Sequence, residues 1–220
     1  MDSCEYCDTQ IDYHEVIECI TCALDAKDPY TAGHSKRVSD MATKVCELIG
    51  LKKEDIQKIH IAAHLHDIGK IGVPDAVLNK EGKLTDEEWE YIRKHPQSGA
   101  DILSKSHRLS ELKNMVLCHH ERYDGSGYPD GLKGEEIPIS AQVVSIVDVY
   151  DALTSERCYK KAFDHDTAIQ MILDGQCGQF NPILLKCLKE LSLQLSKMLN
   201  KEMDDNKYSH EIQRLSNEIL

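Results

Sequence analysis

Apolar residues recur at helical spacing through most of the chain. Between residues 11 and 27, Val16, Ile17, Ile20, Ala23 and Leu24 fall on one side of a helix with a period of 3.6 residues. The segment Asp28-Pro29-Tyr30-Thr31-Ala32-Gly33 interrupts this pattern. The same spacing predicts further helices over 34–49, around residue 60, and near 108–122, 139–155, 165–174 and 182–200.

Local signals mark where other helices begin and end. Thr85-Asp86-Glu87-Glu88 has the form of a capping box and predicts a helix that runs to about Lys94, where His95-Pro96 ends it and starts another. The apolar run 143–149 continues through Ala152 and Leu153, which favours a buried helix over a strand. We therefore expect an all-α fold, with 1–10 as an N-terminal extension, 11–200 as one domain and 201–220 as a C-terminal helical tail.

One long irregular segment interrupts the helical pattern. Residues 123–138, YDGSGYPDGLKGEEIP, contain four glycines and two prolines. A loop of that length inside a compact domain usually has a function.

Composition narrows the class of protein. A chain of 220 residues with 41% hydrophobic content can bury one sizeable core. The sequence contains neither a run of 18 apolar residues nor a secretory N-terminus, so we expect a cytoplasmic protein without a membrane span. The net charge of −12 disfavours long nucleic acid as a partner, although a basic pocket for a small anion is compatible with it.

Polar side chains continue the apolar faces of several predicted helices. Ile59, Ala62 and Ala63 lead at the next helical positions to His66 and Asp67. Other predicted helices have polar residues at comparable positions: His34 at the start of 34–49, His119 and His120 at the end of 108–122, and Asp148 within 139–155.

Burial of so many ionisable groups requires compensation. An unpaired buried carboxylate costs several kcal/mol, and a divalent metal compensates carboxylates and imidazoles together. For any single histidine, a satisfied core residue is the better interpretation by roughly two to one, but several such positions favour a metal site. Six other histidines do not share the pattern and are interpreted as surface or structural residues: His14, His60, His64, His107, His165 and His210.

The same residues carry a family resemblance. The order His34, His66-Asp67, Asp148 resembles the HD superfamily of metal-dependent phosphohydrolases. The segments HLHDIGKIGVPDAVLNKEGKLTDEEWEYIRKHP and HHERYDGSGYPDGLKGEEIP, the second with Gly127-Tyr128-Pro129, are similar to the HD-GYP subfamily from about residue 27 to 182.

This resemblance implies a helical bundle with a metal cluster in its core and phosphodiesterase activity on a cyclic dinucleotide. The expected substrate is cyclic di-GMP, opened to linear pGpG and onward to GMP. The implied ligands are His34, His66, Asp67, His95, His119, His120 and Asp148, with Asp67 as the bridging ligand. Asp67 and Lys70 are the implied catalytic residues, and Lys70, Tyr128, Arg157 and Lys160 the implied substrate contacts.

The implied cofactor is two or three divalent metal ions, with iron or manganese favoured by imidazole and carboxylate ligands. Tyr30 stands where some members with three metals have an acidic ligand, which favours two. Gln142 stands where many members have arginine, and we expect it to affect packing. Two alternatives remain open: a phosphohydrolase acting on another cyclic dinucleotide or a nucleotide, and a catalytically weak binding or scaffold protein.

Two further patterns lie near the ends of the chain. Cys4-x-x-Cys7 and Cys19-x-x-Cys22 could form a four-thiolate zinc site, but the short gap between the pairs favours free thiols. A short coiled-coil seam for a homodimer is indicated by Leu184, Leu188, Leu191, Leu195 and Met198, and core packing explains these positions equally well.

Overall fold

The described part of the chain is built from helices and loops. The structure, a computed structural model, describes residues 12–28, 33–156 and 161–190, and these contain no strand. The elements are α1 (Tyr13–Lys27), α2 (His34–Leu48), α3 (Lys53–Leu65), η2 (Ile68–Gly72), α4 (Asp75–Leu78), α5 (Asp86–Arg93), α6 (His95–Leu103), η3 (Leu109–Leu112), α7 (Lys113–Leu117), η4 (Gly134–Glu136), α8 (Ile139–Thr154) and α9 (His165–Leu173), followed by a helix over 182–190. The predicted all-α class is confirmed.

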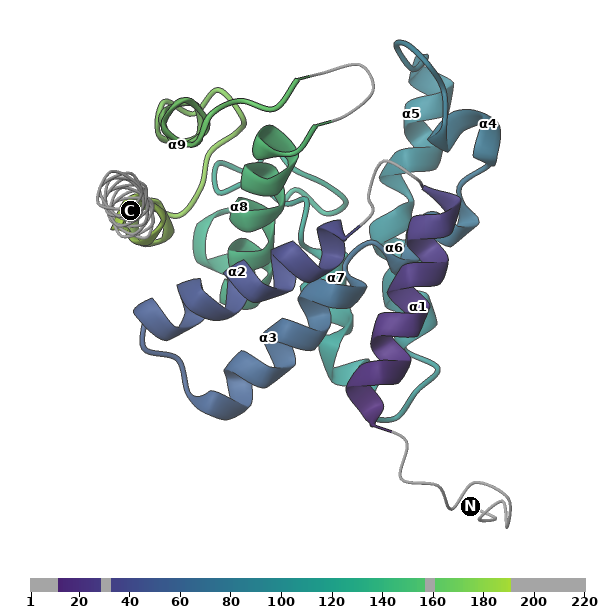
Figure 1. Cartoon of the computed structure of the whole chain (residues 1–220), viewed down its shortest axis with the longest axis horizontal. Helices are drawn as coiled ribbons and strands as arrows, with labels where there is room; N and C mark the ends of the chain where they lie inside the picture. The colour runs from purple at the N-terminus through teal and green to yellow at the C-terminus, as the bar shows by residue number, and fades with distance from the viewer. Residues whose placement is uncertain (1–11, 29–32, 157–160, 191–220) are drawn as a thin grey trace, which may run out of the picture.

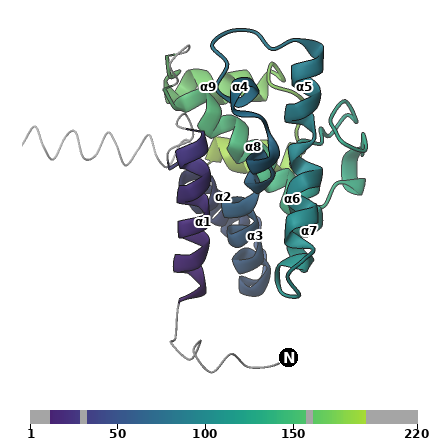
Figure 2. The same ribbon diagram turned by 90° about the vertical axis from the view of Figure 1, so that its right-hand side faces the viewer.

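Helix α8 is the most buried helix described in the bundle. Every residue from Ser140 to Val147 is buried, which confirms that the apolar run belongs to a buried helix. Helix α2 packs against both α3 and α8, and α6 packs against η2 and α7 (Figure 1). Helix α1 lies alongside α3 on the outside of the bundle (Figure 2).

Helix α3 contributes to two apolar clusters. Ile59 and Ala63 belong to the main core, which also includes side chains of α2, α8 and α9. Ala62 and Leu65 belong to a second core with residues of α1, α6 and α7. The chain therefore leaves α3, at His66 and Asp67, at a position fixed by packing on two sides.

The capping box predicted at Thr85 is present. The Thr85 hydroxyl accepts the backbone N–H of Glu88 at 3.3 Å, and the Glu88 carboxylate accepts the backbone N–H of Thr85 at 2.8 Å. Helix α5 ends at Arg93 and α6 begins at His95, as expected.

The single helix predicted over 108–122 is wrong. This region forms the short 3-10 helix η3 and then α7, which ends at Leu117. The imidazole of His119 donates to the carbonyl of Val116 at 2.6 Å. A continuing helix would give that carbonyl to the backbone N–H of His120, so the side chain ends the helix.

The patterns near the chain ends are only partly described. Cys19 and Cys22 are exposed free thiols on α1, and Cys4 and Cys7 lie outside the described residues. Leu184 and Leu188 are buried in the main core, whereas Leu191, Leu195 and Met198 are outside the described ranges. The domain boundaries and the homodimer stay predictions. No helix in the described ranges has the length and apolarity that a membrane crossing requires.

Candidate metal centre

Residues from five separate parts of the sequence meet beside the end of α3. Ligand atoms of Asp67, His95, His119 and His120 lie within 4.8 Å of one another, as do those of His34, His66 and Asp67. Asp148 of α8 joins the second group, because its Oδ1 is 3.3 Å from His34 Nε2. The structure thus brings together all seven residues expected as ligands.

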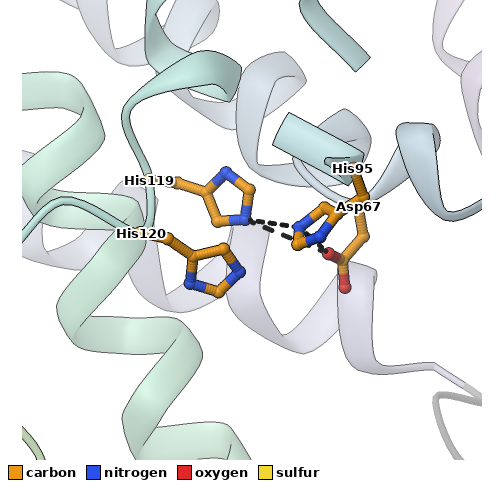
Figure 3. A group of neighbouring side chains, drawn as sticks. All are labelled: Asp67, His95, His119 and His120. Carbon is orange, nitrogen blue, oxygen red and sulfur yellow. Dashed lines mark hydrogen bonds and ion pairs between the residues drawn. The ribbon is translucent and has the colours of Figure 1, made fainter. Parts of the chain in front are cut away.

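The Asp67 carboxylate lies between the two groups. Its Oδ1 atom is 3.2 Å from His95 Nε2 and 4.0 Å from His119 Nε2 (Figure 3). Its Oδ2 atom is 3.4 Å from His66 Nε2 and 4.0 Å from His34 Nε2. Each oxygen faces a different set of imidazoles, which is the arrangement that a carboxylate between two cations requires.

Three of the histidines share one local geometry. Nδ1 of His66, His95 and His119 donates at 2.6 Å to the carbonyl three residues earlier, which belongs to Ala63, Ile92 and Val116 respectively. Each of these carbonyls lies in the last turn of a helix, where the helix does not continue to supply the backbone N–H four residues later. For Ile92 that residue is Pro96, which has no N–H. The imidazole proton is therefore held on Nδ1, which leaves the Nε2 lone pair facing the centre.

His34 is oriented by side chains. Its Nδ1 donates to Asp151 Oδ2 at 2.7 Å, and Arg37 donates to both oxygens of the same carboxylate at 2.6 and 2.9 Å. Burial raises the pKa of Asp151, but the hydrogen bonds from His34 and Arg37 outweigh it and lower the pKa to about 2. Sequence analysis missed Asp151, although it lies one helical turn after Asp148.

The donor set fits a cation. Nε2 atoms of His34 and His66 are 3.3 Å apart, and those of His95 and His119 are 3.2 Å apart. Two nitrogens bound to one tetrahedral ion at about 2.0–2.1 Å would be separated by about 3.3–3.4 Å. Burial, then the neighbouring imidazoles, lower the pKa of His119 well below its ordinary value and that of His120 to about 3, so both present lone pairs.

Lys70 lies against the shared carboxylate. Its Nζ donates to Asp67 Oδ2 at 2.6 Å and is 3.9 Å from Asp28 Oδ2. Burial lowers the pKa of Lys70, but Asp67 outweighs it and the net shift is upward, so the amine is protonated. The adjacent Gly69 lets η2 approach α6, because a Cβ there would be 1.9 Å from the carbonyl oxygen of His95.

A cavity of about 580 Å³ opens beside the centre. It is large enough for a small-molecule ligand. Tyr128 lines it and stacks on His120 with ring centroids 4.8 Å apart, and Trp89 and Arg122 also line it. The roles of Trp89 and Arg122 were not predicted, and no spacing rule in the sequence links either residue to the ligands. Arg157 and Lys160 lie outside the described residues.

The glycine-rich loop is held in place by Glu121. This buried carboxylate accepts the backbone N–H groups of Asp130, Gly131 and Leu132 at 2.8 to 3.1 Å. A Cβ at Gly127 would lie 2.3 Å from the backbone nitrogen of Arg122, so only glycine permits this packing. The loop is thus a fixed turn that also presents Tyr128 to the cavity.

Gln142 acts in packing, as expected. Its amide donates to the carbonyl of Ile137 at 2.7 Å and accepts from the Asn181 amide at 2.9 Å. It does not line the cavity that contains the metal-ligand candidates.

Comparison with known proteins identifies the family to which the fold and the cluster of histidines and aspartates belong. A family profile described as HD domain matches residues 18–182. The chain is 41% identical over 186 residues to the cyclic di-GMP phosphodiesterase response regulator RpfG of Xanthomonas campestris pv. campestris, covering 84% of this chain and 49% of that protein. It is 37% identical over 178 residues to the 3'3'-cGAMP-specific phosphodiesterase 3 of Vibrio cholerae, covering 79% of this chain and 39% of that protein.

A solved structure shares the fold. Bd1817 from Bdellovibrio bacteriovorus, described as a HDG"Y"P protein, superposes with a TM-score of 0.61 at 19% identity, covering 80% of this chain and 60% of that one. The chain spans about half the length, or less, of the curated relatives described above.

Fold and site together define a helical-bundle protein with a buried centre of histidines and aspartates. The chain belongs to the HD domain family, and the resemblance to its HD-GYP group is confirmed.

Proposed function

We propose that the protein is a metal-dependent phosphodiesterase that opens cyclic di-GMP to linear pGpG and onward to GMP. The observation that carries this proposal is the convergence of seven imidazoles and carboxylates, Asp67 among them, next to a cavity of suitable size. Four of the five imidazoles are oriented by a hydrogen bond from Nδ1. The relatives named as cyclic di-GMP phosphodiesterases support it.

Two divalent ions, iron or manganese, are the proposed cofactor. His34, His66 and Asp148 would hold one ion and His95, His119 and His120 the other, with Asp67 shared between them. Bound cations would supply Lewis acidity, which neutralises phosphate oxygens and lowers the pKa of water near them. Imidazole and carboxylate ligands without thiolate suit both metals.

The chain's own residues would bind and orient the substrate. Lys70, protonated and 2.6 Å from Asp67, is placed to stabilise negative charge on the phosphoryl oxygens. Arg122 adds a second positive charge to the cavity wall. Tyr128 and Trp89 offer aromatic faces against which a guanine base can stack.

The proposal is tested by measuring cleavage of cyclic di-GMP by protein loaded with iron or manganese under anaerobic conditions. Asp67→Ala removes the shared carboxylate, so we expect loss of at least one metal ion per chain and of all detectable cleavage. Products are resolved by chromatography and metal content by elemental analysis.

Asp101→Ala is the matched control, because Asp101 is an exposed aspartate on α6, the helix that also carries His95. It should retain metal and activity. A fully loaded wild-type protein that cleaves no cyclic dinucleotide, or an Asp67→Ala variant with wild-type turnover, would refute the proposal. Less than one metal per chain in the wild type would favour a scaffold role.

A second candidate substrate is 3'3'-cGAMP, because several relatives of similar identity are named as specific for it. Both substrates present guanine and two phosphodiesters, so the same centre suits either. Competition between equal concentrations of the two, with kcat/KM compared for each, decides which is preferred. We expect the higher value for cyclic di-GMP.

A further inference from the structure

A second histidine cluster lies between α1 and α3. It consists of His14 on α1 with His60 and His64 on α3, residues that the sequence pattern assigned to surface or structural roles. One ligand nitrogen from each lies within 4.8 Å of the other two. Ring centroids are 4.9 to 5.3 Å apart, a spacing similar to that of the His34–His66 and His95–His119 pairs at 5.2 Å. None of the three lines the cavity beside Asp67.

Helix α2 fixes the ring protons of the two α3 histidines. The hydroxyl of Thr43 donates to the carbonyl of Ser39, and the hydroxyl of Ser39 donates to the carbonyl of Lys36, both at 2.9 Å. Each hydroxyl therefore accepts from the imidazole it contacts: Thr43 from His60 Nδ1 at 3.1 Å and Ser39 from His64 Nε2 at 2.9 Å. The lone pairs left over are on His60 Nε2 and His64 Nδ1.

These two lone pairs have different surroundings. His64 is 2% exposed, and its buried Nδ1 has no hydrogen-bond partner among the residues that the structure describes. His60 Nε2 faces His14 Nε2 at 3.1 Å. His14 Nδ1 is in turn 3.8 Å from the Glu18 carboxylate, which favours a proton on Nδ1 and a lone pair on Nε2. Two lone pairs at that separation repel each other unless a cation lies between them.

We propose that His14, His60 and His64 form a second metal site, distinct from the Asp67 centre, that binds one divalent transition metal ion, with zinc as the best match. Three imidazoles and one open position for water make a common zinc donor set. Thr43, Ser39 and Glu18 would orient the three rings, as outer residues do in known metal sites. The ion would join α1 to α3, the helix that leads directly to His66 and Asp67.

The competing interpretation is a hydrogen-bonded histidine cluster without metal. In that case His14 would carry a proton on Nε2 and would donate it to His60 Nε2. This interpretation accounts for the 3.1 Å contact but leaves His64 Nδ1 without a partner. The two interpretations differ in the number of zinc ions bound, which can be counted.

The test is zinc binding by the full chain, first stripped of metal with a chelator. His14→Ala and His60→Gln should each bind one zinc equivalent fewer than the wild type, whereas Asp67→Ala should lose ions only from the other centre. Elemental analysis after gel filtration gives the count. Loading Asp67→Ala with Co²⁺ gives a second measurement, because its tetrahedral absorption band should be weaker when His14→Ala is added to the same chain. Circular dichroism verifies that each variant is folded.

His107→Ala is the control, because His107 is exposed and belongs to neither cluster. It should keep the wild-type number of ions. Thr43→Val leaves all three ligands but removes the acceptor for His60 Nδ1, so its zinc affinity at this site should fall about 10- to 100-fold. Equal zinc content in the wild type, His14→Ala and His60→Gln would overturn the proposal, whatever the activity on cyclic dinucleotides.

Discussion

At the scale of single residues, four of the five histidines of the centre use both ring nitrogens. One nitrogen donates to a fixed acceptor, a helix carbonyl for three of them and Asp151 for His34, and the other faces the ligand cluster. The acceptor fixes the tautomer, so no proton has to move before these Nε2 atoms can bind a cation. His34 differs from the other three because it is protonated without metal. Burial lowers its pKa, but Asp148 and Asp151 outweigh burial and raise the pKa to about 9, so a metal ion must displace a proton from His34.

Replacing Asp151 tests this orientation. Asp151→Asn keeps an oxygen that can accept from His34 Nδ1 but removes the charge that pairs with Arg37. We expect metal affinity at the Asp67 centre to fall about 10- to 100-fold, measured by competition with a metal-binding dye. Asp101→Asn, on the exposed side of α6, serves as the control. Unchanged affinity in Asp151→Asn would mean that His34 is positioned by packing alone.

The glycine before Lys70 is a second residue on which the centre depends. In Gly69→Ala the new Cβ would meet the carbonyl oxygen of His95 at 1.9 Å and the backbone nitrogen of Gly99 at 2.6 Å, so η2 and α6 must separate. We expect a loss of about 1–3 kcal/mol in the free energy of unfolding, together with weaker metal binding through His95.

Gly72→Ala is the matched control, because Gly72 belongs to the same 3-10 helix and a Cβ there would meet nothing within 4 Å. Urea denaturation of the metal-free proteins compares the stabilities. A Gly69→Ala variant as stable as Gly72→Ala would show that the two elements can separate without cost.

At the scale of elements, helix α5 presents Trp89 to the cavity and depends on its capping box. Thr85→Ala removes the hydroxyl that accepts the Glu88 N–H, and we expect it to destabilise the protein by about 1 kcal/mol at pH 7 in urea denaturation. Thr85→Ser should restore most of the loss. A stability equal to that of the wild type would indicate that α5 unfolds independently of the rest of the bundle.

The same cap predicts a dependence on pH. Lys80, and then the backbone N–H of Thr85, lower the pKa of Glu88 below its ordinary value of 4.5. A carboxyl with a lowered folded-state pKa stabilises the protein fully above pH 4.5 and loses that contribution as the pH falls through the folded value. Glu88→Gln should therefore be less stable than the wild type at pH 7, and the difference should narrow below pH 4.5.

The sequence predicted the existence of the helices better than their ends. The apolar faces of α2 and α8 and the capping box of α5 are local signals, and the structure agrees with each of them. The stop at Leu117 depends on an imidazole turning back onto the carbonyl of Val116, which apolar spacing does not encode. Continuation of the pattern past Leu117 therefore gave a helix that was too long.

The candidate site also contains residues that local sequence signals predict and residues that they do not. Six of the seven clustered residues were found because charged groups on apolar faces are costly, whereas His95 and the arrangement of the set came from the family resemblance. Asp151, Glu121 and Trp89 were missed because their roles depend on three-dimensional contacts that apolar spacing does not encode, such as the three loop N–H groups that Glu121 accepts. The His14–His60–His64 cluster was missed because His14 and the α3 pair come from different helices.

At the scale of the whole molecule, the ligand candidates of the Asp67 centre come from α2, α6 and α8 and from the ends of α3 and α7. Metal binding should therefore raise the free energy of unfolding of the whole bundle. An ion at 100 times its dissociation constant adds about 2.7 kcal/mol. For a chain of this size that corresponds to about 5–10 °C in Tm. We expect a chelator to lower Tm by that amount and added Mn²⁺ to restore it, as followed by calorimetry. An unchanged Tm would show that the described site binds no ion tightly.

The three helix-ending imidazoles limit which substitutions evolution or design can make. A cysteine or a carboxylate at position 66, 95 or 119 would still offer an atom to a cation, but the carbonyl of Ala63, Ile92 or Val116 would lose the hydrogen bond that the imidazole donates at 2.6 Å. Only an imidazole both donates to that oxygen and coordinates with its far side. Tolerance to substitution should therefore be narrower at these three positions than at His34, where the acceptor is a side chain and can change together with its partner.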